Sequence, residues 1–261
     1  MKALAARRHD RRAPVVLLLL ALLLVGGLYA ALQPAPASAA PQAASANDVT
    51  NGEKLFAANC ATCHGMGATG TNAAPSLVGV GAAAVDFQVG TGRMPLAMSG
   101  PQAQRKPVVF TPEQISQLAA YVASLGPGPA IPTAEQVDAS KGDPANGMAI
   151  FRTNCAMCHN AVGAGGALSQ GKFAPNLWST SNTHLYEAML TGPQSMPVFN
   201  DANITSQEKR DIIAFIRQQG GTQPGGLSLG SLGPVTEGLW AWVVGIGLLI
   251  GAAVWIGAKS S

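Results

Sequence analysis

The sequence predicts an all-α protein with two tandem domains of one fold, a C-terminal transmembrane helix and an N-terminal transmembrane or signal segment. Three features of the 261 residues predict this: one segment recurs later in the chain, each copy ends on a helix with its own start signal, and apolar runs lie near both ends. Aromatic residues make up only 5% of a chain rich in Gly and Pro, so small cores and many loops are expected.

The repeat is carried by short motifs that keep their order. Residues 51–60 align with residues 146–155 at a constant offset of 95, and both segments start with Asn-Gly and end with Asn-Cys. An Ala-Pro-x-Leu sequence follows at 74–77 and at 174–177, and Met-Pro at 94–95 and at 196–197. Duplication of one domain is the simplest interpretation.

Each copy closes with a predicted helix that begins at a capping box. Thr111 and Gln114 form the first box, and Thr205 and Glu208 form the second. Apolar residues follow at helical spacing, and each helix carries one aromatic residue at the same distance from its cap: Ile115, Leu118, Tyr121, Val122 and Leu125, then Ile212, Phe215 and Ile216.

The net charge of +3 is located in the tails. Residues 1–13 and Lys259 together carry +5, whereas residues 47–237 hold ten Lys or Arg against twelve Asp or Glu, which gives −2. A basic surplus that lies only beside apolar runs does not form a nucleic-acid-binding face. Binding of nucleic acid is therefore excluded as a function.

Two apolar runs predict association with a membrane. Residues 239–258 are uncharged and carry Trp near both ends, where aromatic rings favour the headgroup layer. Residues 15–32 are flanked by Arg and are long enough for an anchor, although Ala37-Ser38-Ala39 also fits a signal cleavage site. The positive-inside rule puts both termini in the cytoplasm if the first span is retained, and the domains on the outer face of the cell membrane.

Changes in composition along the chain give the expected boundaries. In order they are a basic tail with an apolar anchor or signal (1–32), a linker (33–47), a first domain (48–125), a linker (126–145), a second domain (146–219), a linker (220–238) and a transmembrane helix (239–258).

All four cysteines lie in Cys-x-x-Cys-His motifs. These comprise Cys60, Cys63 and His64 in the first copy, and Cys155, Cys158 and His159 in the second. Cys-x-x-Cys also occurs in zinc sites, but a His at the next position is the signature of haem c attachment. The two thiols add to the porphyrin vinyl groups, and the adjacent His becomes an axial ligand of the iron. The sequence thus predicts two covalently bound haem c groups.

A Met-Pro loop in each copy offers the second axial ligand. Met94 follows the first motif histidine by 30 residues, and Met196 follows the second by 37. A thioether opposite His raises the reduction potential of the iron. Met98 competes with Met94, and His184 offers bis-His ligation as an alternative, although a surface or capping role is expected for His184. The shared Met-Pro favours Met94 and Met196.

Two further expectations concern the surroundings of these ligands. The carbonyl groups of Pro75 and Pro175 are expected to accept hydrogen bonds from the imidazole N–H of the two motif histidines, which fixes the ring orientation. The other methionines of the two copies have no counterpart and are expected to fill gaps in the cores: Met66, Met148, Met157 and Met189.

Taken together, the motifs make each half resemble a class I cytochrome c domain. The features shared with that family are the Gly-x-x-x-Phe helix before each motif, the Pro loop, the Met-Pro loop and the final helix. In that family the first and last helices cross, and Gly52 and Gly147 would allow their close approach. The order of basic tail, apolar run, two domains and final span is similar to the dihaem cytochrome c subunits of actinobacterial bc1 complexes, the menaquinol–cytochrome c oxidoreductases.

This resemblance implies electron transfer from a Rieske iron–sulfur protein to a terminal cytochrome c oxidase, in a respiratory complex that includes cytochrome b. The N-terminal haem would accept electrons, and the C-terminal haem would pass them on. The chain would be the electron-transfer subunit of a quinol–cytochrome c reductase, with no catalytic residue of its own. The alternatives are the cytochrome subunit of a periplasmic dehydrogenase and a dihaem peroxidase, which needs one iron with an open site.

Overall fold

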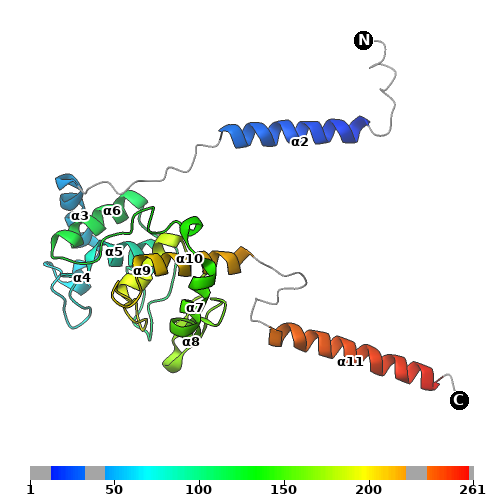
Figure 1. Cartoon of the computed structure of the whole chain (residues 1–261). Coiled ribbons are helices and arrows are strands. Elements are labelled where there is room, and N and C mark those ends of the chain that lie inside the picture. The colour runs from blue at the N-terminus through cyan, green and yellow to red at the C-terminus, as the bar shows by residue number, and fades with distance from the viewer. Residues whose placement is uncertain (1–12, 33–44, 222–233, 259–261) are drawn as a thin grey trace, which may run out of the picture. The chain divides into compact units, whose positions relative to one another are not determined.

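The structure is a computed structural model that describes residues 13–32, 45–221 and 234–258 (Figure 1). The chain divides into two units at residues 40 and 41, and each is described by itself. The first unit contains helix α2 (Ala13–Leu32). In the second unit the first half contains α3 (Ala46–Asn59), α4 (Ala61–His64), α5 (Gly81–Gly90) and α6 (Pro112–Ser124). The second half contains η1 (Ala139–Lys141), α7 (Pro144–Asn154), α8 (Ala156–His159), β1 (Gly166–Ala167), η2 (Ser169–Gly171), β2 (Phe173–Ala174), α9 (Asn182–Thr191) and α10 (Ser206–Gly221). Helix α11 (Pro234–Ala258) follows it.

The first half is built around the crossing of its first and last helices, α3 and α6. Gly52 lies at the crossing, where an added Cβ would come within 2.0 Å of the carbonyl oxygen of Gln117. One turn later Phe56 contacts Tyr121, with 5.3 Å between the ring centroids. Only glycine permits this approach, and the aromatic pair then fills the space beside it.

The second half repeats this crossing with α7 and α10. An added Cβ on Gly147 would lie 1.9 Å from the carbonyl oxygen of Asp211. Phe151 contacts Phe215 with the same centroid separation, 5.3 Å, and an interplanar angle of 49° against 47° in the first half. The predicted close approach of the helices at both glycines is therefore confirmed.

The two predicted capping boxes are present. The hydroxyl of Thr111 accepts a hydrogen bond from the backbone N–H of Gln114, whose side chain accepts one from the N–H of Thr111. Thr205 and Glu208 make the same reciprocal pair at the start of α10. Each box satisfies backbone donors that the first helical turn leaves without a partner.

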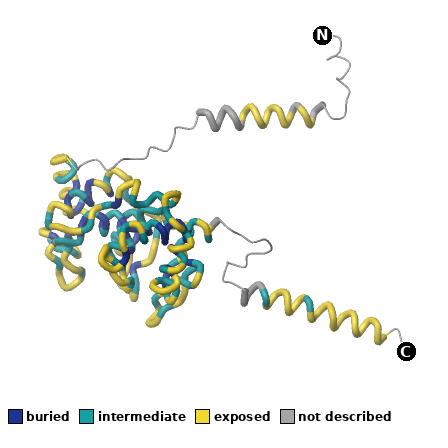
Figure 2. The backbone as a smooth tube through the Cα atoms, in the orientation of Figure 1, coloured by how far each residue is buried: buried dark blue, intermediate teal, exposed yellow. Residues whose placement is uncertain are grey.

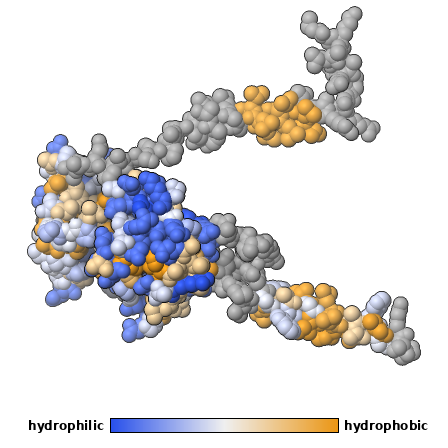
Figure 3. All heavy atoms as spheres, viewed as in Figure 1, coloured by the Kyte–Doolittle hydropathy of each residue, from blue (hydrophilic) through white to orange (hydrophobic). Residues whose placement is uncertain are grey.

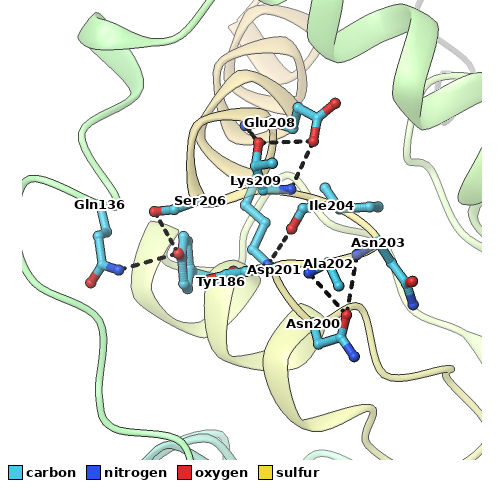
Figure 4. A network of polar contacts seen from close by, with 11 residues as sticks. Gln136, Tyr186, Asn200, Asp201, Ala202, Asn203, Ile204, Ser206, Glu208 and Lys209 are labelled. Carbon is cyan, nitrogen blue, oxygen red and sulfur yellow. Dashed lines mark hydrogen bonds and ion pairs between the residues drawn. The ribbon is translucent and has the colours of Figure 1, made fainter.

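A buried polar network fixes the loop that leads into α10 (Figure 4). The ammonium group of Lys209 is fully buried, donates to Asp201 Oδ1 at 2.6 Å and to the carbonyl oxygen of Ile204 at 2.5 Å, and lies 5.7 Å from the centroid of the Tyr186 ring. The hydroxyl of Tyr186 in turn donates to Ser206 Oγ at 2.8 Å. A buried cation is tolerated because each of its contacts is to an oxygen or a π face.

The two halves contact each other through α5 and α9. Alternate residues are buried along the whole of α5, which packs on α6 of its own half and on α9 of the other. Farther along, the side-chain amide of Gln102 makes two hydrogen bonds to the backbone of Phe173, and the N–H of Ala103 donates to Gln194. The halves therefore share an interface of apolar and polar contacts.

The segment between the halves lies against the first half. The N–H of Ala83 donates to the carbonyl oxygen of Pro129 at 3.1 Å. Gly81 has a φ of +80°, and a Cβ there would lie 2.4 Å from the same oxygen. Backbone packs directly on backbone at this point, so the predicted linker is an ordered part of the fold.

The described parts of the two long apolar helices expose their side chains. Along α11, Gly238–Ala258 is long and apolar enough to cross a membrane by length and composition, and no part of its most apolar stretch is buried. The described residues of α2 between 15 and 25 are also exposed (Figures 2 and 3). Such surfaces suit hydrocarbon rather than water. The predicted all-α class with a C-terminal apolar helix is confirmed.

Candidate functional site: two Cys-x-x-Cys-His turns

Each Cys-x-x-Cys-His motif folds into a single helical turn. In α4 the N–H of His64 donates to the carbonyl oxygen of Cys60 at 3.0 Å, and in α8 the N–H of His159 donates to that of Cys155 at 2.9 Å. None of the four cysteines forms a disulfide. The turn keeps the two sulfurs and the imidazole of each motif close together in space, as one porphyrin requires.

The predicted proline contacts are present. The Nδ1 atom of His64 lies 2.8 Å from the carbonyl oxygen of Pro75, and that of His159 lies 3.1 Å from the carbonyl oxygen of Pro175. A carbonyl can only accept, so Nδ1 carries the proton and Nε2 keeps its lone pair. This is the tautomer that coordinates a metal through Nε2.

Two glycines outside the recognised motifs shape the loops behind the histidines. Gly70 and Gly165 have φ of +87° and +89°, and each donates its N–H to the carbonyl oxygen of the motif histidine. A Cβ on either residue would lie 2.6 Å from backbone of the proline loop. The sequence does contain a signal for these two glycines, because they are related by the repeat offset of 95 residues.

Burial sets the charge state of these groups in the second half. It lowers the pKa of His159, against the opposing effect of the hydrogen bond to Pro175, and so favours the neutral imidazole that can bind iron. Burial also raises the pKa of Cys155 to about 12, and the proximity of Cys158 adds to this effect. The site favours an uncharged sulfur, which a thioether provides.

The methionines of the two halves differ in how far they are exposed to solvent. Met94 packs against the core of the first half and Met196 against that of the second, whereas Met98 is 79% exposed. Met148 and Met189 belong to the second core as expected. The expectation of core packing was wrong for the other two, since Met66 is 73% and Met157 is 88% exposed. Both lie in or just after a Cys-x-x-Cys-His turn, whose outer face is open.

A cavity in the second half brings the predicted haem ligands together. Its lining includes Cys155, Cys158, His159 and Met196, with apolar side chains of α9 and α10 around them. The lining also includes residues of the first half, among them Phe87, Arg93, Gln102 and Arg105. The cavity of the second half is therefore completed by the first.

Arg93 shows what kind of group this cavity accepts. Its side chain is 8% exposed, its guanidinium carbon lies 4.7 Å from the centroid of the Phe87 ring, and it donates to Thr91 Oγ1 at 2.6 Å. Among the described residues no carboxylate lies within ion-pair distance of it, and burial lowers its pKa. A buried cation without an anionic neighbour fits an anionic group in the cavity, such as a haem propionate. Haem c matches the set of groups in this cavity, which are the thiols of Cys155 and Cys158, the imidazole of His159, the thioether of Met196 and the guanidinium of Arg93.

His184 has its own environment beside this cavity. Its backbone N–H donates to Ser181 Oγ at 3.1 Å, which places it in the capping turn of α9, and its Nε2 lies 3.5 Å from Asp86. The ring also lines the cavity. His184 is thus not itself the cap of α9, and its side chain, 20% exposed, contacts a carboxylate of the other half instead of lying on the surface, which was not expected.

Comparison with known proteins agrees with this geometry. Residues 47–122 and 142–216 each match the family described as "Cytochrome C oxidase, cbb3-type, subunit III". The chain is 44% identical to the "Cytochrome bc1 complex cytochrome c subunit" of Mycobacterium tuberculosis over 97% of this chain and 93% of that protein. Proteins of the same name from Corynebacterium efficiens and Corynebacterium diphtheriae are 43% and 42% identical, each over 99% of this chain and over 94% and 99% of their own lengths.

Cytochrome c domains of this kind imply covalently bound haem c and a role in electron transfer. The matched segments each contain one complete Cys-x-x-Cys-His turn and its Met-Pro loop. The long relatives match the apolar helices as well as the domains, which indicates association with a membrane. The chain belongs to the family of cytochrome bc1 complex cytochrome c subunits.

Proposed function

We propose that this chain is the dihaem c-type cytochrome subunit of a quinol–cytochrome c reductase of the bc1 type. In this role it carries electrons from a Rieske iron–sulfur protein to a terminal cytochrome c oxidase. The observation that carries the proposal is the repetition of one complete ligand set in two halves of a chain that matches bc1 cytochrome c subunits over nearly its whole length. Cytochrome b and the Rieske protein are the proposed partners within the complex.

Each half is proposed to hold one haem c. The thioethers are assigned to Cys60 and Cys63 in the first half and to Cys155 and Cys158 in the second; the axial ligands are assigned to His64 with Met94 and to His159 with Met196. The support is that both histidines have Nδ1 bound to a proline carbonyl and that both methionines pack against their own core. The exposure of Met98 favours Met94 over it.

The bound haem supplies reversible one-electron chemistry at iron. His64 with Met94, and His159 with Met196, would hold the iron of each haem, so no coordination position would be left for a substrate such as peroxide. The two halves then act as electron carriers, and quinol chemistry belongs to other subunits of the complex. A dihaem peroxidase is disfavoured for this reason, and a dehydrogenase cytochrome is disfavoured by the match to bc1 subunits along the chain.

Arg93 connects the two proposed haem sites. Arg93 directly precedes the proposed ligand Met94 of the first haem, yet its side chain lines the cavity of the second half. The corresponding position before Met196 is a serine, so this arginine is not part of the repeat. We assign it to a propionate of the second haem, where its charge favours the reduced state of that haem.

The proposed topology follows from the two apolar helices. Both α2 and α11 are assigned as membrane spans, with the domains at 48–125 and 146–219 on the outer face and the termini in the cytoplasm. Mass spectrometry of the purified chain tests the first span. A mature N-terminus at residue 40, just after Ala37-Ser38-Ala39, would make it a cleaved signal instead.

The first experiment is a reduced-minus-oxidised visible spectrum of the protein purified from its native membranes in mild detergent. The expected spectrum contains b-type and a-type haem bands with the c-type band, because the partners co-purify. A spectrum with c-type haem alone, together with carbon monoxide binding or a co-purified dehydrogenase, would replace the bc1 function by one of the alternatives.

The order of the haems is tested separately. We propose that the N-terminal haem accepts electrons and the C-terminal haem passes them on. In stopped flow with quinol, Met94→Ala should slow the reduction of the second haem, whereas Met196→Ala should leave the reduction of the first haem unchanged. The opposite pattern would reverse the order.

A further inference from the structure

A cluster of three metal-ligating side chains lies where the two halves meet. Asp86 comes from α5 of the first half, and His184 and Glu187 come from α9 of the second. The Nε2 atom of His184 lies 3.5 Å from Asp86 Oδ2 and 4.0 Å from Glu187 Oε2. One ligand atom from each residue lies within 4.8 Å of the other two. None of the three is needed to hold haem.

The spacing of the cluster is suitable for a small cation. Bonds of about 2.0–2.2 Å to imidazole nitrogen and carboxylate oxygen place neighbouring ligand atoms about 3–3.5 Å apart around a tetrahedral ion. The separation of His184 and Asp86 already has this value, and that of His184 and Glu187 is slightly longer. Glu187 lies three residues after His184, so the helix directs both side chains to one face.

The environment of Glu187 is independent evidence that this cluster binds a cation. Its side chain is fully buried, and neither carboxylate oxygen has a hydrogen-bond partner. Among the described residues, the titratable groups beside this carboxylate are Asp86, which has the same charge, and His184. A carboxylate in this position is costly unless a cation neutralises it.

The imidazole of His184 is held in place by α5. A Cβ added at Gly90 would lie 2.9 Å from Nε2 of His184, so a side chain at position 90 would displace the ring. Phe87 contacts the ring edge-on, with 6.0 Å between centroids and 87° between planes. Nε2 is thereby fixed toward the two carboxylates, as a preorganised ligand would be.

We propose that Asp86, His184 and Glu187 form a binding site for one divalent transition-metal ion, with Zn²⁺ the best match. One nitrogen and two carboxylate oxygens suit Zn²⁺, whereas Ca²⁺ and Mg²⁺ favour all-oxygen sites. The two carboxylates and one neutral imidazole sum to −2, which a divalent ion neutralises. Asp86 and His184 have side chains about one-fifth exposed, 23% and 20%, so water has access to the fourth position.

The metal would act as a clamp between the two halves. It would join α5 to α9 at one end of the interface, while the hydrogen bonds of Gln102 to Phe173 join the halves elsewhere. Because His184 also lines the cavity of the second half, the clamp would fix the wall of that cavity. In this role the ion would hold one domain in register with the other.

The test uses the haem-loaded full chain in detergent, without an affinity tag. The protein is treated with EDTA, equilibrated with a small excess of ZnCl₂, dialysed against metal-free buffer, and analysed for zinc by mass spectrometry relative to haem iron. We expect one zinc per chain in the wild type. Loss of one ligand in Glu187→Gln should weaken zinc binding by at least about 10–100-fold, the range seen even for outer-shell changes. Glu135→Gln, the same change at a side chain that is 73% exposed, is the matched control and should keep one zinc.

The outcomes of this test distinguish the zinc site from the proposed haem ligands. Asp86→Asn, at a partly exposed position, gives the same test if Glu187→Gln does not fold, and an unchanged haem spectrum verifies folding. Wild-type protein that retains no stoichiometric zinc, or cluster variants that retain as much as Glu135→Gln, would overturn the site. Neither result bears on the haem ligands, whose failure would instead appear in the visible spectrum.

Discussion

The crossing of α7 and α10 gives a prediction whose size follows from the coordinates. An alanine at Gly147 would place its Cβ 1.9 Å from the carbonyl oxygen of Asp211 and 2.8 Å from the backbone N of Ile212. Ordinary contact begins near 3.4 Å, so the two helices would have to separate by about 1.5 Å. Because the clash is with backbone, no rotation of a side chain can relieve it.

Two opposing terms set the change in the free energy of unfolding. Alanine is favoured over glycine inside a helix by about 1 kcal/mol. Overpacking of a close contact costs about 1–3 kcal/mol, and a backbone clash at this distance belongs at the upper end of that range. The second domain should lose about 2 kcal/mol of stability. At about 4–8 °C per kcal/mol for a domain of this size, its melting temperature should fall by about 10 °C.

The assay is thermal unfolding of the haem-loaded protein in detergent, followed by far-ultraviolet circular dichroism. The control is Gly67→Ala, where the added Cβ would meet only Thr69 Cγ2 at 3.8 Å. Gly52→Ala should destabilise the first domain in the same way, since its clash distance is 2.0 Å. If Gly147→Ala melted within about 2 °C of Gly67→Ala, the helices would not be held at this crossing as described.

Three further changes have defined outcomes. Arg93→Gln removes a buried positive charge from the cavity of the second half, so the reduction potential of the C-terminal haem should fall by a few tens of mV, where about 59 mV is a tenfold change for one electron; a redox titration with no shift would contradict the propionate assignment. Lys209→Met leaves the carbonyl oxygen of Ile204 without its donor and should lower the stability of the second domain by about 1–3 kcal/mol in denaturant unfolding, whereas an unchanged midpoint would mean that water replaces the ammonium group. Met94→Ala should open the first iron to carbon monoxide after reduction, and Met98→Ala should not; carbon monoxide binding in the Met98 variant instead would exchange the two assignments.

Much of the repeated framework could be predicted from the sequence because it depends on local chemistry. Capping boxes specify their own hydrogen bonds within four residues, and both appear as expected. The glycines at the helix crossings were identified by the resemblance, since the sequence pattern alone gives no reason for helical residues 52 and 147 to lack a side chain. The carbonyl groups of Pro75 and Pro175 followed from the need of an axial histidine for a partner.

The contacts between the halves could not be predicted in this way. Helix α5 buries every second residue, because it is covered by α6 on one side and by α9 on the other, so its sequence has no helical period. Glu187 has the sequence context of a surface residue on an ordinary helix, yet it is buried where α9 packs on other helices. The same holds for Arg93, whose role depends on a cavity formed by residues about 60–120 positions later in the chain.

The hydrogen bonds between Gln102 and Phe173 have a consequence for the rate of respiration. A cytochrome that shuttles between partners must diffuse and collide, and such encounters slow down as salt rises or as the carrier is diluted. Two redox domains that already share an interface replace the encounter by a first-order step with a fixed effective concentration. Throughput between the halves should then be independent of ionic strength and of the amount of carrier.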